Sequence, residues 1–153
     1  MKAVIQRVSR AEVRVDGEVV GKIGEGYLIL VGVMNGDTIN EAQLLARKTA
    51  NLRIFTDEND KMNRSILDID GEVLAVSQFT LCADVHKGNR PSFIESAPPQ
   101  EANALYEAFC SVLSENGVRK VEKGVFGAHM EVSLLNNGPV TILYDTDTWK
   151  GKA

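Results

Sequence analysis

The stretch Asn136-Asn137-Gly138-Pro139-Val140-Thr141 lies near the C-terminal end of the chain and leads into an apolar run, residues 140–144. Asn-Gly is a turn dipeptide because both residues tolerate a positive φ, and the proline removes a backbone donor where the apolar run begins. The stretch therefore predicts a turn that connects two strands, residues 128–135 and 140–145. Backbone carbonyls around such a turn can also point at a ligand, so two interpretations stay open, a connecting turn or part of a binding site.

A second stretch, Ser77-Gln78-Phe79-Thr80-Leu81, favours the binding site. It places three hydrogen-bonding side chains at the end of an otherwise apolar run, which predicts a strand over residues 72–81 that begins apolar and becomes polar. A rigid strand end is a good platform for a site. Residues 82–97 follow without periodicity, and a connection of that length is either functional or disordered.

Apolar periodicity along the rest of the chain predicts one α+β domain. The expected strands are residues 2–15, 18–23, 27–34, 52–55, 72–81, 118–123, 128–135 and 140–145. Thr38 and Glu41 have the spacing of a capping box before a first helix, and Pro98-Pro99 opens a second helix that ends at Asn116-Gly117. Hairpin-length links predict a curved, barrel-like, largely antiparallel sheet of about eight strands with two helices. We expect a single domain over residues 1–153, with a frayed tail from about residue 146.

The acidic balance of the chain limits the partners that it attracts. With 153 residues and a formal charge of −4, one domain of ordinary size has no overall attraction to nucleic acid. Contacts with RNA would depend on local basic residues, namely Arg7, Lys87, Arg90, Lys120 and Lys123. No apolar run could span a bilayer and the first residues do not form a signal peptide, so we expect no membrane association and a cytoplasmic location.

The few cysteines and histidines argue against a disulfide or a metal site, and with no glycine-rich phosphate loop we expect no cofactor. Cys82 and Cys110 are 28 positions apart in different predicted elements, and neither has a recognised metal-ligand spacing to His86 or His129. A Ser/His/Asp triad would need histidines brought in from a distance, and no nucleophile elbow surrounds Ser77. Nucleophilic catalysis by Cys82 with His86 is a more specific hypothesis than the triad. A cysteine after an apolar strand is, however, more often packed and inert.

Four stretches together resemble the D-aminoacyl-tRNA deacylase family. They are Ser77-Gln78-Phe79-Thr80-Leu81, Lys87-Gly88-Asn89-Arg90-Pro91-Ser92-Phe93, Gly127-Ala128-His129-Met130 and Asn136-Asn137-Gly138-Pro139-Val140-Thr141. The resemblance covers residues 1–145. Asn137 departs from the aspartate that many members carry, but the following glycine and proline are the residues that the family uses.

The resemblance implies a homodimeric proofreading hydrolase. In that family the Gly-Pro peptide is cis and enters the active site of the other subunit, which assigns substrate binding and chiral selection to Gly138 and Pro139. The implied reaction is hydrolysis of the ester that joins a D-amino acid, or glycine, to the terminal adenosine of tRNA, with L-aminoacyl-tRNA rejected. Ser77, Gln78, Phe79 and Thr80 would form the catalytic site.

The residue inventory suits this chemistry because an aminoacyl ester is already activated. Orientation of water, help from the ribose 2′-OH and N–H donors for the developing oxyanion would suffice, and backbone N–H groups near Phe79 and Thr80 are the expected donors. A nucleophilic Thr80 hydroxyl is the minority mechanism. Two other functions stay open, a non-catalytic module that binds RNA or nucleotides and a generic serine or cysteine esterase.

Overall fold

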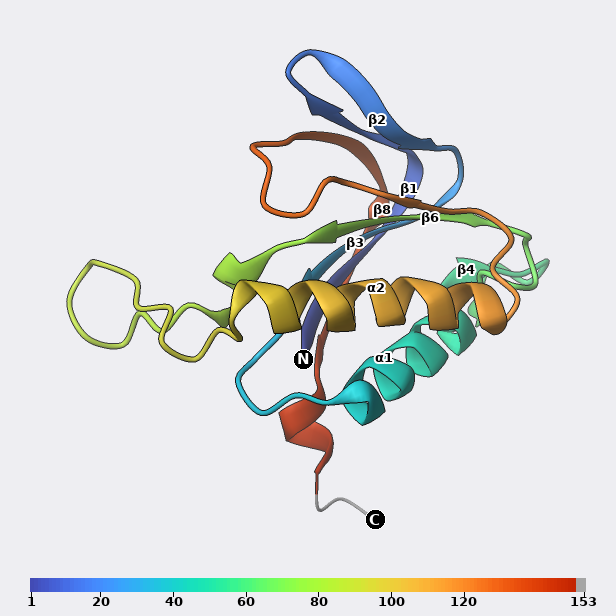
Figure 1. Ribbon diagram of the computed structural model, residues 1–153. Helices are drawn as coiled ribbons and strands as arrows, with labels where there is room; N and C mark the ends of the chain where they lie inside the picture. The colour runs from blue at the N-terminus through green and yellow to red at the C-terminus, as the bar shows by residue number, and fades with distance from the viewer. Residues whose placement is uncertain (151–153) are drawn as a thin grey trace.

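The computed structural model describes residues 1–150 (Figure 1). Its strands are β1 (Lys2–Val15), β2 (Glu18–Ile23), β3 (Gly26–Gly32), β4 (Phe55–Thr56), β5 (Met62–Arg64), β6 (Glu72–Ser77), β7 (Val121–Lys123) and β8 (Glu131–Asp145). The helices are α1 (Ile39–Asn51) and α2 (Pro99–Glu115), with two short 3-10 helices, η1 (Phe79–Cys82) and η2 (Thr146–Trp149). This confirms the α+β class and the two helices, and the eight strands match the expected number.

The six-stranded main sheet is mixed, whereas a largely antiparallel sheet was expected. β1 pairs antiparallel with β2, β3 and β8, but β3 pairs parallel with β6, and β6 pairs parallel with β7. The parallel pairs follow from the two helices, because α1 lies on the connection from β3 to β6 and α2 on the connection from β6 to β7. The strongly curved sheet is nearly closed, and the helices cover one side of it (Figure 1).

β3 is buried on both faces, as its continuous apolar run predicts. Tyr27, Ile29 and Val31 belong to the core between the sheet and the helices, whereas Leu28 belongs to a smaller core inside the curve of the sheet. The alternation arises because successive side chains of a strand point to opposite faces. β3 and its parallel neighbour β6 therefore form a rigid centre, and the polar stretch that begins at Ser77 follows directly from it.

The stretch at 136–141 is not a turn, so the prediction of two separate strands was wrong. β8 runs without interruption from Glu131 to Asp145 along β1. Gln6 pairs with Thr141 and Val8 with Asn136, so that Arg7 alone lies opposite residues 137–140. Asn-Gly-Pro therefore forms a bulge inside one long strand, because β1 offers a pairing partner on both sides of it. The Gly138–Pro139 peptide in this bulge is cis.

Other element limits shift by a few residues. The strand expected at 52–55 is reduced to β4, which pairs with β5, a strand that the sequence did not predict. β3 ends before residue 34, and β7 begins three residues after 118. The capping box is confirmed, since the Thr38 side chain accepts from Asn40 N–H and the Glu41 carboxylate accepts from Thr38 N–H at 2.6 Å.

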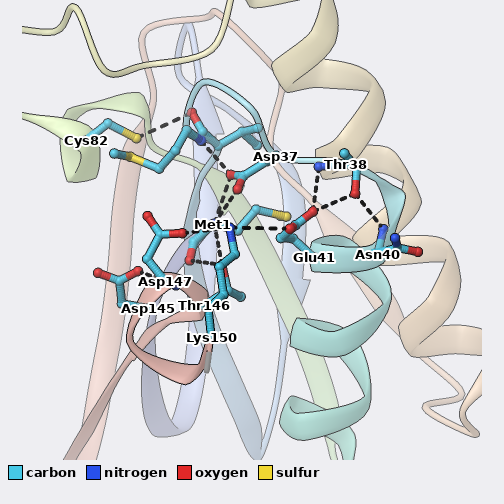
Figure 2. A network of polar contacts seen from close by, with 12 residues as sticks. Met1, Asp37, Thr38, Asn40, Glu41, Cys82, Asp145, Thr146, Asp147 and Lys150 are labelled. Atoms are coloured by element: carbon cyan, nitrogen blue, oxygen red, sulfur yellow. Dashed lines mark hydrogen bonds and ion pairs between the residues drawn. The ribbon is translucent and has the colours of Figure 1, made fainter. Parts of the chain in front are cut away.

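The N-terminus is tied into the core by a buried polar network (Figure 2). The α-ammonium of Met1 pairs with the carboxylate of Asp37 at 2.8 Å, and both side chains are almost completely buried. The same ammonium donates to Thr146 Oγ1 at 2.7 Å, and Thr146 N–H donates to the carbonyl of Met1 at 3.0 Å. Thr146 is buried and opens η2, so residues 146–149 are ordered where a frayed tail was expected. Gly151-Lys152-Ala153, the rest of that tail, lies outside the described residues.

Candidate active site

A pocket of about 500 Å³ opens where β6 ends. One side is formed by Ser77, Gln78 and Phe79, and another by the start of α2 together with Ser96. The segment before β8 completes it, with Phe126, Gly127, Ala128, His129 and Met130. The pocket thus gathers three of the four residues predicted to be catalytic.

The backbone turns sharply after Ser77, and residues 79–82 form η1 where a strand to residue 81 was expected. Gln78 N–H still donates to the carbonyl of Val31 at 2.7 Å, and Leu81 N–H then donates to the carbonyl of Gln78 at 3.2 Å. Gly32 permits this turn, because a Cβ at residue 32 would lie 3.0 Å from the Cβ of Leu81. The absence of a side chain on β3 therefore lets η1 pack against the end of the sheet.

The N–H groups of Phe79 and Thr80 lie in the first turn of η1. The first N–H groups of a helix have no acceptor within it, and neither group has another acceptor among the described residues. Two adjacent N–H groups beside a pocket can bind a carboxyl oxygen or a developing oxyanion. The sequence analysis expected these two groups to be the oxyanion donors, and that role stays a prediction.

The side chains around these donors are polar on one side and aromatic on the other. Gln78 Nε2 donates to Thr80 Oγ1 at 2.6 Å, so the amide orients the threonine hydroxyl. An amide that donates in this way cannot also remove a proton from the hydroxyl. Phe79 is 54% exposed, and its ring meets Phe93 edge to face with centroids 5.0 Å apart. Thr80 is thus held in place, although no base contacts it in the described part of the chain.

The bulge that carries Gly138 and Pro139 is held from both sides. Arg7 Nε donates to the carbonyl of Asn137 at 2.9 Å, and Arg7 Nη1 donates to the carbonyl of Ile54 at 2.6 Å. Inside the bulge, Asn136 Oδ1 accepts from Val140 N–H at 3.0 Å. Gly138 and Pro139 are exposed and are not among the residues that line the pocket of their own chain. The single chain therefore does not bring the two predicted parts of the site together.

The two cysteines and His86 occupy positions unsuited to nucleophilic catalysis. Cys82 is buried, its thiol donates to the carbonyl of Val33 at 3.4 Å, and burial raises its pKa. Burial likewise raises the pKa of Cys110 to about 12. The His86 ring contacts the Asp84 carboxylate on an exposed loop. Raised thiol pKa values disfavour the thiolate that a cysteine esterase requires.

The sequence analysis missed most of the far wall of the pocket, which is formed by residues 126–130. Residues 127–130 contributed to the family resemblance but received no role, and Phe126 was not singled out at all. The only local signal is the pair Gly124 and Gly127, which bracket an apolar dipeptide. Gly124 matters for packing, since a Cβ there would lie 2.6 Å from Met130 Sδ, and Gly127 has φ +80°. The glycines thus allow the segment to fold over the pocket.

The described residues contain no helix that is both long and apolar enough to cross a membrane. Within residues 1–150, no group of three or more His, Cys, Asp or Glu side chains has an arrangement that could hold a metal ion.

Comparison with known proteins assigns the chain to one family. The family model described as D-Tyr-tRNA(Tyr) deacylase matches residues 4–145. A D-aminoacyl-tRNA deacylase of Anaeromyxobacter dehalogenans is 59% identical over 146 residues, covering 95% of this chain and 97% of the relative. One of Thermomicrobium roseum is 58% identical over 151 residues, covering 99% and 97%.

Two solved structures share the fold of this chain. A protein described as c-Myc DNA Unwinding Element Binding Protein superimposes with a TM-score of 0.89 at 43% identity, covering 95% of this chain and 98% of that one. A probable eukaryotic D-amino acid tRNA deacylase shares the fold with a TM-score of 0.80 at 18% identity, covering 94% and 97%. From the match over nearly its whole length and from its relatives, this chain belongs to the D-Tyr-tRNA(Tyr) deacylase family.

Proposed function

We propose that this protein is a proofreading hydrolase that cleaves the ester of D-aminoacyl-tRNA and glycyl-tRNA, releasing the amino acid and tRNA while rejecting L-aminoacyl-tRNA. The observation that carries the proposal is the pair of N–H groups of Phe79 and Thr80, which have no acceptor among residues 1–150 and lie beside the pocket of a member of this family. The substrate is the aminoacylated 3′ end of tRNA, and we place the reaction in the cytoplasm, where tRNA is charged and used.

Hydrolysis in this site needs orientation more than a strong nucleophile. Water adds to the ester carbonyl carbon, and the carbonyl oxygen gains negative charge that the N–H groups of Phe79 and Thr80 would stabilise. The bond from that carbon to the ribose oxygen then breaks, and a proton from the water ends on the ribose oxygen. Ser77 and Gln78 shape the pocket, and the neighbouring ribose hydroxyl positions the water. The mechanism as proposed uses no metal or cofactor.

The role of the ribose can be tested on the substrate. A D-aminoacyl-tRNA that ends in 2′-deoxyadenosine should lose a factor of about 10²–10³ in rate, the usual value of one well-placed interaction with the transition state. Thr80→Val should keep measurable activity on the ordinary substrate, because the hydroxyl is held by the Gln78 amide and no base among the described residues contacts it. Single-turnover deacylation rates measure both effects. Full activity on the deoxy substrate would contradict this mechanism, and complete loss in Thr80→Val would favour the nucleophilic threonine.

A homodimer is part of the same proposal, with Gly138 and Pro139 of each subunit entering the pocket of the other. β8 lies at an edge of the sheet and pairs only with β1 among the described strands. An unpaired edge is a template for association with another chain. β8 also carries exposed apolar side chains on both sides of the bulge, with Leu135 47% and Leu143 75% exposed. These features fit an interface that includes the bulge.

Leu143→Lys should weaken the dimer and reduce deacylation together, because the pocket would lack the partner's bulge. Sedimentation velocity over a range of concentrations, read beside the deacylation rate, measures the coupling. Met62→Lys is the matched control, since Met62 is 59% exposed on β5, which belongs to the separate two-stranded sheet and does not pair with β8. A wild-type protein that is monomeric and fully active would overturn the shared site.

The two other functions can be separated by simple assays. A module that only binds RNA would hold D-aminoacyl-tRNA without releasing amino acid. A generic esterase would hydrolyse simple esters that lack a ribose, which the proposed enzyme should not do. Release of amino acid from D-tyrosyl-tRNA, compared with turnover of p-nitrophenyl acetate, distinguishes all three.

A further inference from the structure

The long connection between η1 and α2 contains a projecting loop, residues 84–92, that the proposed chemistry does not use. Its two ends are joined by a pair of backbone hydrogen bonds between Asp84 and Ser92, at 2.8 and 2.9 Å. The loop stands off the body of the domain beside the N-terminal end of α2 (Figure 1). The loop is therefore a closed arm with a defined base. The sequence had left open whether this connection is functional or disordered.

The tip of the 84–92 loop is basic although the chain as a whole is acidic. Lys87 and Arg90 are exposed, and neither forms an ion pair with any residue from 1 to 150. The one carboxylate of the loop, Asp84, accepts hydrogen bonds from the ring and the N–H of His86. Asp84 is thus engaged at the base of the arm, and the two cations at its tip remain available to a partner.

Both ends of the loop connect to the rim of the pocket. The chain enters the loop from η1, whose first residue Phe79 lines the pocket. It returns through Phe93, which packs against Phe79, and Ser96, which also lines the pocket. An RNA whose 3′ end lies in the pocket must leave past this rim, so its backbone would pass close to the arm.

We propose that the 84–92 loop binds the phosphate backbone of the tRNA acceptor end through Lys87 and Arg90, while the pocket holds the terminal nucleotide. This inference rests on the proposed function for the identity of the RNA. Lys and Arg suit this task because each phosphate that a cation neutralises releases counterions, a term that does not depend on base sequence. The acidic remainder of the surface limits such contacts to a few.

The test is a binding titration with uncharged tRNA, which requires no turnover. The Lys87→Gln/Arg90→Gln double variant should bind tRNA about tenfold more weakly at low salt, and its plot of log affinity against log salt should be shallower by about 1.4–1.8 for two lost phosphate contacts. Arg47→Gln/Lys48→Gln is the matched control, because it removes the same charge from exposed positions on α1 that do not line the pocket. The control should keep the wild-type slope.

A second experiment separates the effect of the loop from that of the pocket. D-tyrosyl-adenosine carries the ester and the ribose without the RNA backbone, so the loop variant should cleave it at the wild-type rate while its KM for D-tyrosyl-tRNA rises several-fold. Equal losses on both substrates, an unchanged salt slope, or the same loss in the control variant would each overturn the phosphate contact. Loop-dependent binding of tRNA without any deacylation would instead contradict the proposed function while still supporting the phosphate contact.

Discussion

Wild-type protein should release tyrosine from D-tyrosyl-tRNA and glycine from glycyl-tRNA, but should cleave L-tyrosyl-tRNA no faster than spontaneous hydrolysis does. In the proposed dimer, the main-chain carbonyls of the partner's bulge accept hydrogen bonds from the α-ammonium of the substrate and fix its Cα against the peptide. A D side chain then leaves toward solvent, whereas an L side chain would drive its Cβ into the peptide. Glycine has no Cβ and cannot be rejected in this way. Comparable wild-type rates on the two enantiomers of tyrosyl-tRNA would refute the proposal.

The position of the bulge can be disturbed without changing any side chain that touches the substrate. Gly138→Ala should lower the rate on D-tyrosyl-tRNA by at least about 10²-fold, the cost of misplacing a positioning group by about 1 Å. The residue has φ +139°, and a Cβ there would lie 2.8 Å from Val140 Cγ2 and 3.0 Å from Arg7 Nη2. Gly17→Ala is the matched control, since Gly17 has φ +81° but open space around its Cβ position. Equal activity in the two variants would show that the bulge does not position the substrate.

Asp37→Ala should be among the most destabilising single substitutions in this chain. The carboxylate pairs with the buried α-ammonium of Met1 at 2.8 Å and accepts from Met34 N–H at 2.7 Å. Removing one partner of a buried ion pair costs about 3–5 kcal/mol because the other charge is left without compensation. Urea unfolding measures the loss as a fall in the midpoint with little change in slope.

Two controls define the cause of that loss. Asp37→Asn keeps the shape and an acceptor but removes the charge, so its stability should lie between those of wild type and Asp37→Ala. Glu107→Ala breaks an exposed ion pair with Lys123 and should change the midpoint much less, because water replaces an exposed partner at small cost. A midpoint of Asp37→Ala equal to that of Glu107→Ala would contradict a stabilising role for the buried pair.

The N-terminal network is also connected to the pocket. Met34, whose N–H donates to Asp37, forms a bridge with Ser96, and Ser96 lines the pocket. Asn35 N–H also donates to the carbonyl of Glu95 at 2.8 Å. The turn that Asp37 closes is therefore joined to the pocket wall by backbone hydrogen bonds.

The sequence by itself determined the elements whose signals are local. The capping box at Thr38 and Glu41 needs only residues three apart, so the start of α1 could be predicted. The alternation in β1 and the continuous apolar run in β3 indicated how each strand is buried. The sequence and its family resemblance also predicted a site at the polar stretch from Ser77 to Thr80 and at the Gly138-Pro139 pair, and these roles stay predictions.

Only the tertiary structure decided how those segments are paired and placed. Asn136-Asn137-Gly138-Pro139 has the local chemistry of a turn, yet it stays within β8 because β1, more than 120 positions earlier, offers hydrogen-bond partners on both sides of it. The strand expected to reach residue 81 ends at Ser77 because Gly32 of a neighbouring strand leaves room for η1. The far wall of the pocket and the ordered segment at Thr146 likewise depend on distant partners. A local pattern reports the preferences of a few adjacent residues, whereas pairing and packing are decided by backbone and side-chain groups that meet only after the chain has folded.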